Sequence, residues 1–165
     1  MSNLTKSFII IIVCAITFYT IAFFFGQKKT NEAVAFEWEK NVKVYFVDRN
    51  QVRETSCEAN SFVERTVINA ETLGPGAIEA LIMGLTAEEN EYLVTSINSK
   101  TNMLRFELID GVAYVDFDKN LNDGIGGSCM VVSIKTQIEN TLLDLPEINQ
   151  VVISVEGETE GILEP

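Results

Sequence analysis

Three stretches of the chain have the apolar and polar pattern of β-strands. In Asn41–Asp48, every second residue is apolar, which is typical of a half-buried strand. Phe62–Asn69 is a second short strand, separated from the first by the charged loop Arg49–Ser61. Gln150–Gly157 is the last, and its four apolar residues favour a central position in a sheet.

The strongest local signal is a predicted hairpin at Asn102–Asp118. Asp110-Gly111 joins two alternating runs, and an Asp-Gly loop favours a two-residue type I′ turn, which fixes the register. The facing pairs expected to form an apolar face are Ile109–Val112, Leu108–Ala113, Phe106–Val115 and Leu104–Phe117. On the other face, the register predicts Glu107 opposite Tyr114 and a charge pair between Arg105 and Asp116.

Two segments have the three- to four-residue apolar spacing of amphipathic helices. The first is Gly74–Leu85, with Pro75 suited to its first turn and Gly84 to its end. The second starts near Ser128, which is predicted to cap it, and Pro146 prevents its continuation. Its apolar positions are Met130, Val131, Ile134, Ile138, Leu142 and Leu145. Its positions predicted to face water are Lys135, Gln137, Glu139 and Asn140.

Helices that alternate with strand pairs predict an α+β fold, with two helices packed on one face of a mostly antiparallel sheet. The apolar Ile162-Leu163 pair near the C-terminus is expected to dock locally.

The N-terminal segment 7–26 contains no charged residue and is long enough, at 20 residues, to cross a hydrocarbon core of about 30 Å. Its length and the absence of a small-residue cleavage site favour an uncleaved transmembrane anchor over a signal peptide. We therefore predict a cytoplasmic N-terminus at 1–6, a transmembrane helix at 7–26, a linker at 27–40 and one domain at 41–165. The flanking lysines are balanced, so charge does not decide the orientation.

Charge composition narrows the function. The chain has 12 Lys+Arg and 24 Asp+Glu; three of the basic residues precede residue 30, so residues 30–165 carry 9 − 24 = −15. Such a domain is repelled by nucleic acid, which we exclude as a partner. The chain has no histidine, which excludes Ser-His-Asp and Cys-His catalysis and removes the commonest zinc ligand. We therefore predict no enzymatic activity, no metal site and no cofactor.

The other candidate chemistry is weak. Asp116–Gly124 resembles a calcium loop, but Leu121 and Gly127 occupy the positions where an EF-hand needs glycine and a bidentate glutamate. Ser133 and Lys135 are two residues apart on a helix and so point away from each other. The C-terminal carboxylates are predicted to be a solvated acidic edge: Glu156, Glu158, Glu160 and Glu164.

Cys129 follows a Gly-Gly pair at the start of the second predicted helix. A helix N-terminus lowers the pKa of a thiol, which favours a reactive cysteine, but no histidine is present to act as a base. A buried free thiol and one half of a disulfide are the other two interpretations. The choice depends on whether the domain lies in an oxidising compartment.

The order and spacing of several segments resemble the GerMN domain family of sporulation and spore-germination proteins. These segments are "VKVYFVD", "GAIEALIMGLTAEE", "GGSCMVVSIKTQIENTLLDLPEINQVVISVEG" and "TEGILEP", and the resemblance covers Val42–Pro165. It implies an extracytoplasmic domain held at the membrane, a fold related to ring-building modules, and no catalytic activity or cofactor. The chain departs from the family pattern at Leu85, where "G-P-T" is usual after the first helix.

The resemblance also favours a Cys57–Cys129 disulfide, because similar sequences often carry both positions and the implied compartment is oxidising. We predict a single-pass membrane protein whose extracytoplasmic domain is a non-catalytic interaction or assembly module in cell-envelope or sporulation-type processes. Its partners are expected to be proteins or further copies of itself. The alternative is a binding module for a small ligand or a cell-wall fragment.

Overall fold

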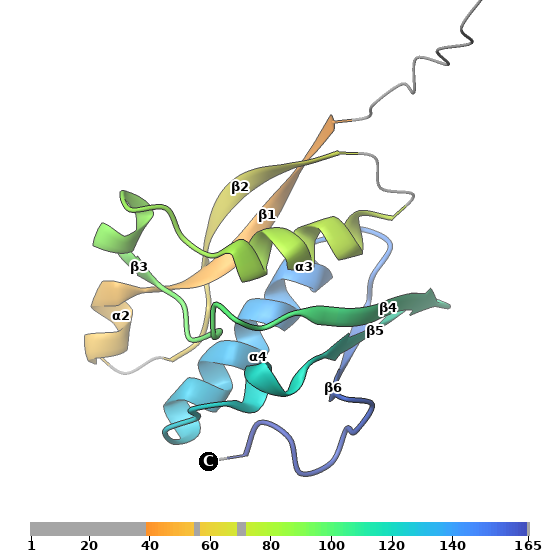
Figure 1. The fold of residues 1–165 in the computed structure, drawn as a ribbon. Helices are drawn as coiled ribbons and strands as arrows, with labels where there is room; N and C mark the ends of the chain where they lie inside the picture. The colour runs from red at the N-terminus through yellow and green to blue at the C-terminus, as the bar shows by residue number, and fades with distance from the viewer. Residues whose placement is uncertain (1–38, 55–56, 69–71, 165) are drawn as a thin grey trace, which may run out of the picture. The chain divides into compact units, whose positions relative to one another are not determined.

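The computed structural model describes residues 39–54, 57–68 and 72–164 (Figure 1). In chain order, the elements are β1 (Glu39–Asp48), α2 (Arg49–Glu54), β2 (Ser61–Ile68), α3 (Leu73–Met83), the 3₁₀ helix η1 (Glu89–Glu91), β3 (Leu93–Val94), β4 (Met103–Ile109), β5 (Val112–Phe117), the 3₁₀ helix η2 (Lys119–Asn122), α4 (Ser128–Leu143) and β6 (Gln150–Val155). The short helix α2 lies where the sequence indicated only a charged loop.

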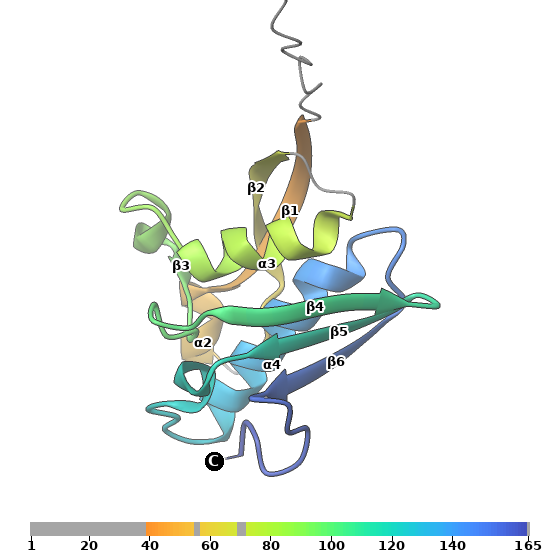
Figure 2. The same cartoon turned by 45° about the vertical axis from the view of Figure 1, so that its right-hand side comes forward.

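The described strands form two three-stranded sheets instead of the single sheet predicted from the sequence. The first has the order β2-β1-β3 and is antiparallel. The second has the order β4-β5-β6, with an antiparallel β4–β5 pair and a parallel β5–β6 pair (Figure 2). The fold is α+β as predicted, but β6 is an edge strand, so its predicted central position is wrong.

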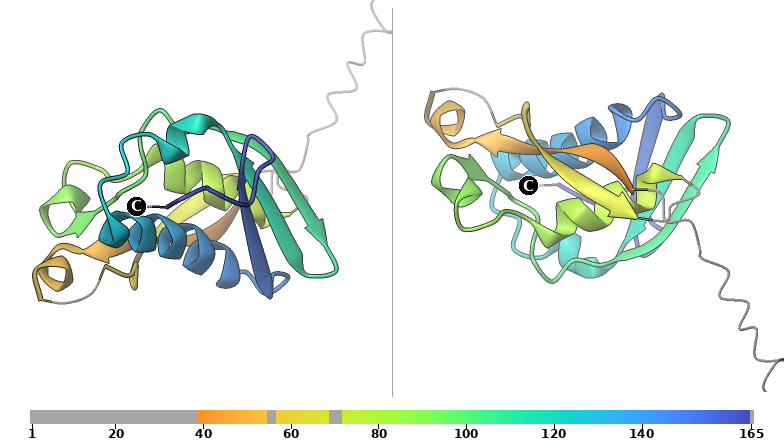
Figure 3. Two further views of the ribbon diagram at one scale, coloured as in Figure 1. Left: turned by 90° about the horizontal axis from the view of Figure 1, so that it is seen from below. Right: turned by 90° about the horizontal axis from the view of Figure 1, so that it is seen from above.

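The two long helices lie between the sheets and separate them. Both α3 and α4 contact strands of each sheet (Figure 3). Along part of β1, α4 takes the place of a neighbouring strand, because the Thr141 hydroxyl accepts a hydrogen bond of 3.0 Å from the Tyr45 amide. That amide therefore pairs with a helix side chain and not with a strand.

The core fills the space between helices and sheets. Its fully buried side chains come from both sheets and both helices, and include Val44, Phe46, Ile78, Leu81, Ile134, Ile138, Leu142, Val115 and Phe117. Two glycines allow α3 to approach the strands closely. A Cβ at Gly74 would overlap the Phe106 ring of β4, and a Cβ at Gly76 would lie 2.6 Å from Val67 Cγ1 of β2.

The predicted hairpin turn is confirmed. Asp110 and Gly111 both have positive φ, at 50° and 81°, as a type I′ turn requires. Of the predicted pairs, Ile109–Val112, Leu108–Ala113, Phe106–Val115, Glu107–Tyr114 and Arg105–Asp116 are all observed.

Three details of the hairpin prediction are wrong. A register irregularity between Met103 and Arg105 places Met103, not Leu104, opposite Phe117. Ile109 is 52% exposed, because residues that alternate along a strand cannot all point to one face. In the described part of the chain, Arg105 and Asp116 are opposite each other but form no ion pair.

Helix α4 differs from its prediction at both its start and its polar face. Gly127, with φ 108°, is the cap residue, and no side chain caps the helix, so the predicted Ser128 cap is wrong. Gln137, predicted to face water, is fully buried. Its side-chain oxygen accepts from the Thr95 hydroxyl at 2.8 Å, and its amide donates to the Ser133 hydroxyl at 3.0 Å. Because every polar atom finds a partner, the burial is tolerated.

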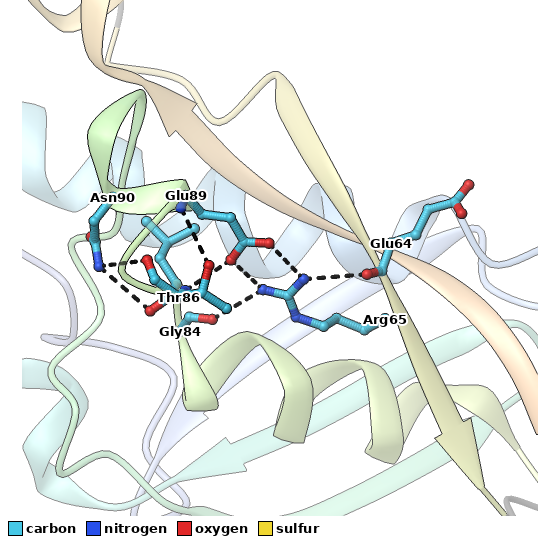
Figure 4. A network of polar contacts seen from close by, with 7 residues as sticks. Glu64, Arg65, Gly84, Thr86, Glu89 and Asn90 are labelled. Carbon is cyan, nitrogen blue, oxygen red and sulfur yellow. Dashed lines mark hydrogen bonds and ion pairs between the residues drawn. The ribbon is translucent and has the colours of Figure 1, made fainter.

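A polar network ties β2 to the loop that follows α3 (Figure 4). The two Arg65 guanidinium nitrogens donate to the Glu89 carboxylate at 2.8 and 2.6 Å. Glu89 also makes reciprocal bonds with Thr86: its carboxylate accepts from the Thr86 amide at 2.8 Å, and its amide donates to the Thr86 hydroxyl at 3.2 Å. This is the exchange of a capping box. The network holds the pKa of Glu89 at about 2, chiefly through the hydrogen bonds from Arg65.

Near the C-terminus, Leu163 is buried and its amide donates to Asn122 Oδ1 at 2.8 Å. The predicted local docking of this segment is confirmed.

Candidate functional site

Cys57 and Cys129 form a disulfide in the structure. Cys57 lies between α2 and β2, and Cys129 is the second residue of α4. Their Cα atoms are 5.3 Å apart, well within the range that a disulfide allows, and they are separated by 72 residues. The bond joins a loop of the first sheet to the helix between the sheets.

Two hydrogen bonds secure the same loop two residues further on. The buried Ala59 donates its amide to the Thr136 hydroxyl at 2.8 Å and accepts from the Asn140 amide at 2.5 Å. Thr136 and Asn140 are one helical turn apart on α4, so both face the loop. The loop is thus fixed by one covalent and two polar contacts, and these position the start of β2.

The other candidates from the sequence are dispersed in the structure. Glu156, Glu158, Glu160 and Glu164 are exposed, Lys135 is exposed, and Ser133 is buried against Gln137. Both Asp118 oxygens bond with Asn102 and Asn120. Partial burial acts to raise the pKa of Asp118, but these hydrogen bonds lower it overall. Among the side chains that are described, no three Asp, Glu or Cys residues gather as a metal site would require.

An exposed surface on the outer side of β1 and β2 was not predicted from the sequence. We call it the aromatic face and define it by Lys43, Tyr45, Phe62, Leu143 and Asp144. The Tyr45 and Phe62 ring centroids are 5.6 Å apart, in a tilted arrangement, and Lys43 Nζ lies 5.0 Å from the Phe62 centroid. Phe62 is 48% exposed and Leu143 is 44% exposed, so the apolar centre of this face is open to solvent.

Asp144 fixes the polar side of the aromatic face. Its Oδ1 accepts from Lys43 Nζ at 3.1 Å and from the Tyr45 hydroxyl at 3.0 Å. The bond to Asp144 raises the pKa of Lys43, and partial burial followed by the same carboxylate raises the pKa of Tyr45. At neutral pH Lys43 is therefore charged and Tyr45 keeps its proton. The face then presents two rings in contact beside an ion pair with no net charge.

The register of β1 and β2 explains why sequence reasoning missed this face. Tyr45 pairs with Phe62 across the two strands, and Lys43 pairs with Glu64. Each strand was predicted, but not the partner of each residue. The aromatic residue at Tyr45, in the row that also contains the polar Asn41 and Lys43, was the available signal.

Hollows of about 220, 230 and 270 Å³ lie on the described surface. Pockets that enclose drug-sized ligands are usually about 300–1,000 Å³. The smallest lies on the aromatic face beside Tyr45 and Leu143, the 270 Å³ hollow lies beside the disulfide, and the third lies on the outer side of the second sheet. These volumes are suited to contact with the surface of another protein or to binding a small chemical group.

The family model described as Germane, sporulation and spore germination, matches residues 43–161. The chain belongs to this family. The match covers nearly the whole of the predicted domain and confirms the resemblance to GerMN domains.

Solved structures share the fold of this Germane domain. The first GerMN domain of the sporulation protein GerM from Bacillus subtilis has a TM-score of 0.54 at 18% identity, over 76% of this chain and 92% of that one. The tandem GerMN domains of the same protein give 0.52 at 18% identity, over 80% of this chain and 43% of the longer one. A candidate lipoprotein from Clostridium perfringens gives 0.50 at 22% identity, over 76% and 80% of the two chains. No curated protein matches the chain significantly.

The predicted anchor at 7–26 lies outside the described residues. Within the described residues, no helix has the length and apolar character needed to span a membrane.

Proposed function

We propose that this Germane domain is a non-catalytic protein-interaction module, held at the outer side of the cell membrane by residues 7–26 and acting in cell-envelope or sporulation-type processes. The aromatic face is the observation that carries the proposal. Interfaces are enriched in aromatic residues because these bury a large area at a low cost in conformational entropy. Tyr45 and Phe62 are already in contact before any partner binds, so little further ordering is required.

Charge indicates which kind of partner this face accepts. Residues 30–165 carry 9 − 24 = −15, so two copies of the domain repel each other over the screening length of about 8 Å. A different protein, with an apolar centre and a basic rim, is attracted instead. We therefore favour a basic protein partner over self-assembly.

No pair of buried carboxylates occurs among the described side chains, which is consistent with the proposed non-catalytic role. Acid-base work by carboxylates generally needs two of them in environments that separate their pKa values. Among the described side chains, Asp116 is the one buried carboxylate. The sequence also contains no histidine that could act as the base for a serine or cysteine nucleophile.

A photo-crosslinking experiment tests the partner. The crosslinking amino acid benzoylphenylalanine replaces Phe62 in the full chain in intact cells, and Tyr92, which is 49% exposed outside the aromatic face, is the matched control position. We expect a protein adduct at position 62 but not at position 92. Leu143→Asp should remove the adduct, because it places a charge in the apolar centre.

Three outcomes would contradict the proposal. An adduct of the chain with itself would overturn the different partner, and equal adducts at both positions would overturn the aromatic face. The third is survival of the position-62 adduct in Leu143→Asp.

Localisation is tested separately by adding protease to intact spheroplasts. Digestion of the domain is expected if it lies outside the membrane. Full protection, with digestion only after lysis, would place it in the cytoplasm.

A further inference from the structure

A second surface, on the outer side of the β4-β5-β6 sheet, has the features of a small binding site. A pocket of about 230 Å³ lies there, across two rows of cross-strand neighbours. One row contains Arg105, Asp116 and Ser154, and the other contains Glu107 and Tyr114. This side of the sheet is opposite the helices (Figure 2).

Asp116 is buried in the pocket with only one oxygen bonded. Its Oδ1 accepts from the Ser154 hydroxyl at 2.6 Å and from the Gly157 amide at 2.8 Å. Within the described residues, its Oδ2 has no hydrogen-bond donor, and this oxygen is not itself fully buried, although the residue as a whole is only 7% exposed. Because Oδ2 is an open acceptor, a ligand in the pocket can donate to it.

Arg105 and Glu107 supply unpaired charges of opposite sign at the same pocket. They lie two residues apart on β4, and Arg105 is opposite Asp116 on β5. Among the residues that the structure describes, the ion pairs are Lys43–Asp144 and Arg65–Glu89, and neither involves these groups. The pocket thus holds the unpaired Arg105 guanidinium, the unpaired Glu107 carboxylate and the free Oδ2 of Asp116.

We propose that this pocket binds the zwitterionic part of an amino acid or a short peptide. The ligand carboxylate accepts from the Arg105 guanidinium, and its ammonium donates to Glu107 and to Asp116 Oδ2. The Tyr114 ring, 43% exposed, provides an apolar surface for a short side chain and a further attraction for the ammonium.

The arrangement selects against simpler ions. A ligand with only a carboxylate meets Arg105 but is repelled by Glu107 and Asp116. A ligand with only an ammonium meets these two carboxylates but leaves Arg105 unpaired. Only a ligand with both charges satisfies all three groups, and the volume suits a ligand of dipeptide size or smaller.

The test uses the full chain in detergent micelles, labelled with ¹⁵N, and L-alanyl-L-alanine as the probe. We expect saturable shifts in the amide resonances of Tyr114, Asp116 and Ser154. N-acetyl-L-alanyl-L-alanine, which lacks the ammonium, and L-alanyl-L-alanine amide, which lacks the carboxylate, should each bind about tenfold more weakly or worse.

Two variants link the probe chemistry to individual residues. Arg105→Gln should weaken L-alanyl-L-alanine about tenfold and abolish the preference for it over its amide, because the carboxylate loses its partner. Glu107→Gln should abolish the preference for the free over the acetylated amino group. Both residues are exposed, so the fold should tolerate both changes. The matched controls are the exposed Lys135→Gln and Glu91→Gln, which should bind as the unmodified chain does.

Three results would overturn the proposal: no saturable shift at these amides, equal binding of the probe and its blocked forms, or saturable shifts confined to another surface. In the first case Arg105 and Glu107 are ordinary solvated surface charges.

Discussion

Glu89→Gln removes one negative charge from the network that joins β2 to the loop after α3 (Figure 4). The amide can still accept from Thr86, but it no longer forms the bidentate ion pair with Arg65. The substitution therefore isolates the contribution of the charge. We expect it to lower the free energy of unfolding at neutral pH.

The size of the effect follows from the pKa of Glu89. A change from the ordinary value of 4.5 to about 2 corresponds to about 3 kcal/mol of stabilisation at neutral pH. The side chains of Arg65 and Glu89 are 21% and 14% exposed, so solvent screens part of this energy. A loss of about 1–2 kcal/mol is the realistic expectation.

The effect must depend on pH in a defined direction. Because folding lowers the pKa of Glu89, the stabilisation is complete above about pH 4.5 and is lost as the pH falls through about 2. Urea unfolding followed by far-ultraviolet circular dichroism, at several pH values between 7 and 2.5, gives the difference between the two proteins. That difference should be largest at pH 7 and shrink steadily in acid.

Glu91→Gln is the control, since Glu91 is an exposed acid in the same short helix. It should change the free energy of unfolding by less than about 0.5 kcal/mol. A Glu89→Gln effect that is equal at pH 7 and pH 2.5, or no larger than that of Glu91→Gln, would refute the reasoning.

Three further substitutions or treatments test other contacts. Reduction of the Cys57–Cys129 disulfide opens a loop that otherwise restricts the unfolded chain, so it should lower the free energy of unfolding by about 4 kcal/mol and lower the Tm; an unchanged Tm after verified reduction would contradict this. Gly111→Val should cost about 1–3 kcal/mol in urea unfolding, since φ is 81° and a side chain would meet Asn149; a cost near zero would mean that the turn relaxes freely. Gln137→Leu should cost about 1–3 kcal/mol, because it removes the hydrogen-bond partner of Thr95; thermal unfolding as stable as that of the unmodified protein would show that this bond contributes little.

The hairpin illustrates what local sequence can specify. Asp110-Gly111 and the alternation beside it determine the turn and most of the register, because both depend on neighbours within a few residues. The irregularity at Leu104 could not be predicted in this way. It lies next to Asn102, whose amide bonds with the Asp118 carboxylate from across the hairpin, and alternation contains no information on that contact.

Gln137 and β6 show where tertiary structure overrides local pattern. A helix between two sheets has less solvent-facing surface than a helix on one sheet, so a position assigned to water becomes fully buried once Thr95 supplies a partner. The apolar residues of β6 indicated that the strand is buried. An edge strand covered by α4 and a central strand have the same apolar pattern, so this pattern did not decide between them.

The candidate surfaces depend on the same long-range information. The aromatic face requires the pairing of Tyr45 with Phe62, and the pocket requires Arg105, Asp116 and Ser154 to share a row across three strands. The hairpin register predicted Arg105 opposite Asp116, but the Tyr45–Phe62 pairing and the addition of Ser154 from β6 are not encoded by spacing along the chain. Cys57 and Cys129 were named together through a family resemblance, and spacing alone left their state open.

The disulfide also limits how far the protein can be stretched. The two cysteines are 72 residues apart. When tension is applied at Glu39 and at the C-terminal segment, the force passes through the disulfide and the chain between the cysteines carries none of it. At about 3.3–3.6 Å per extended residue, roughly 250 Å of contour length is withheld from the pulling force. Pulled between Glu39 and the C-terminal segment, the disulfide-bonded domain would therefore extend by roughly 250 Å less than its reduced form, which could unravel along most of its length.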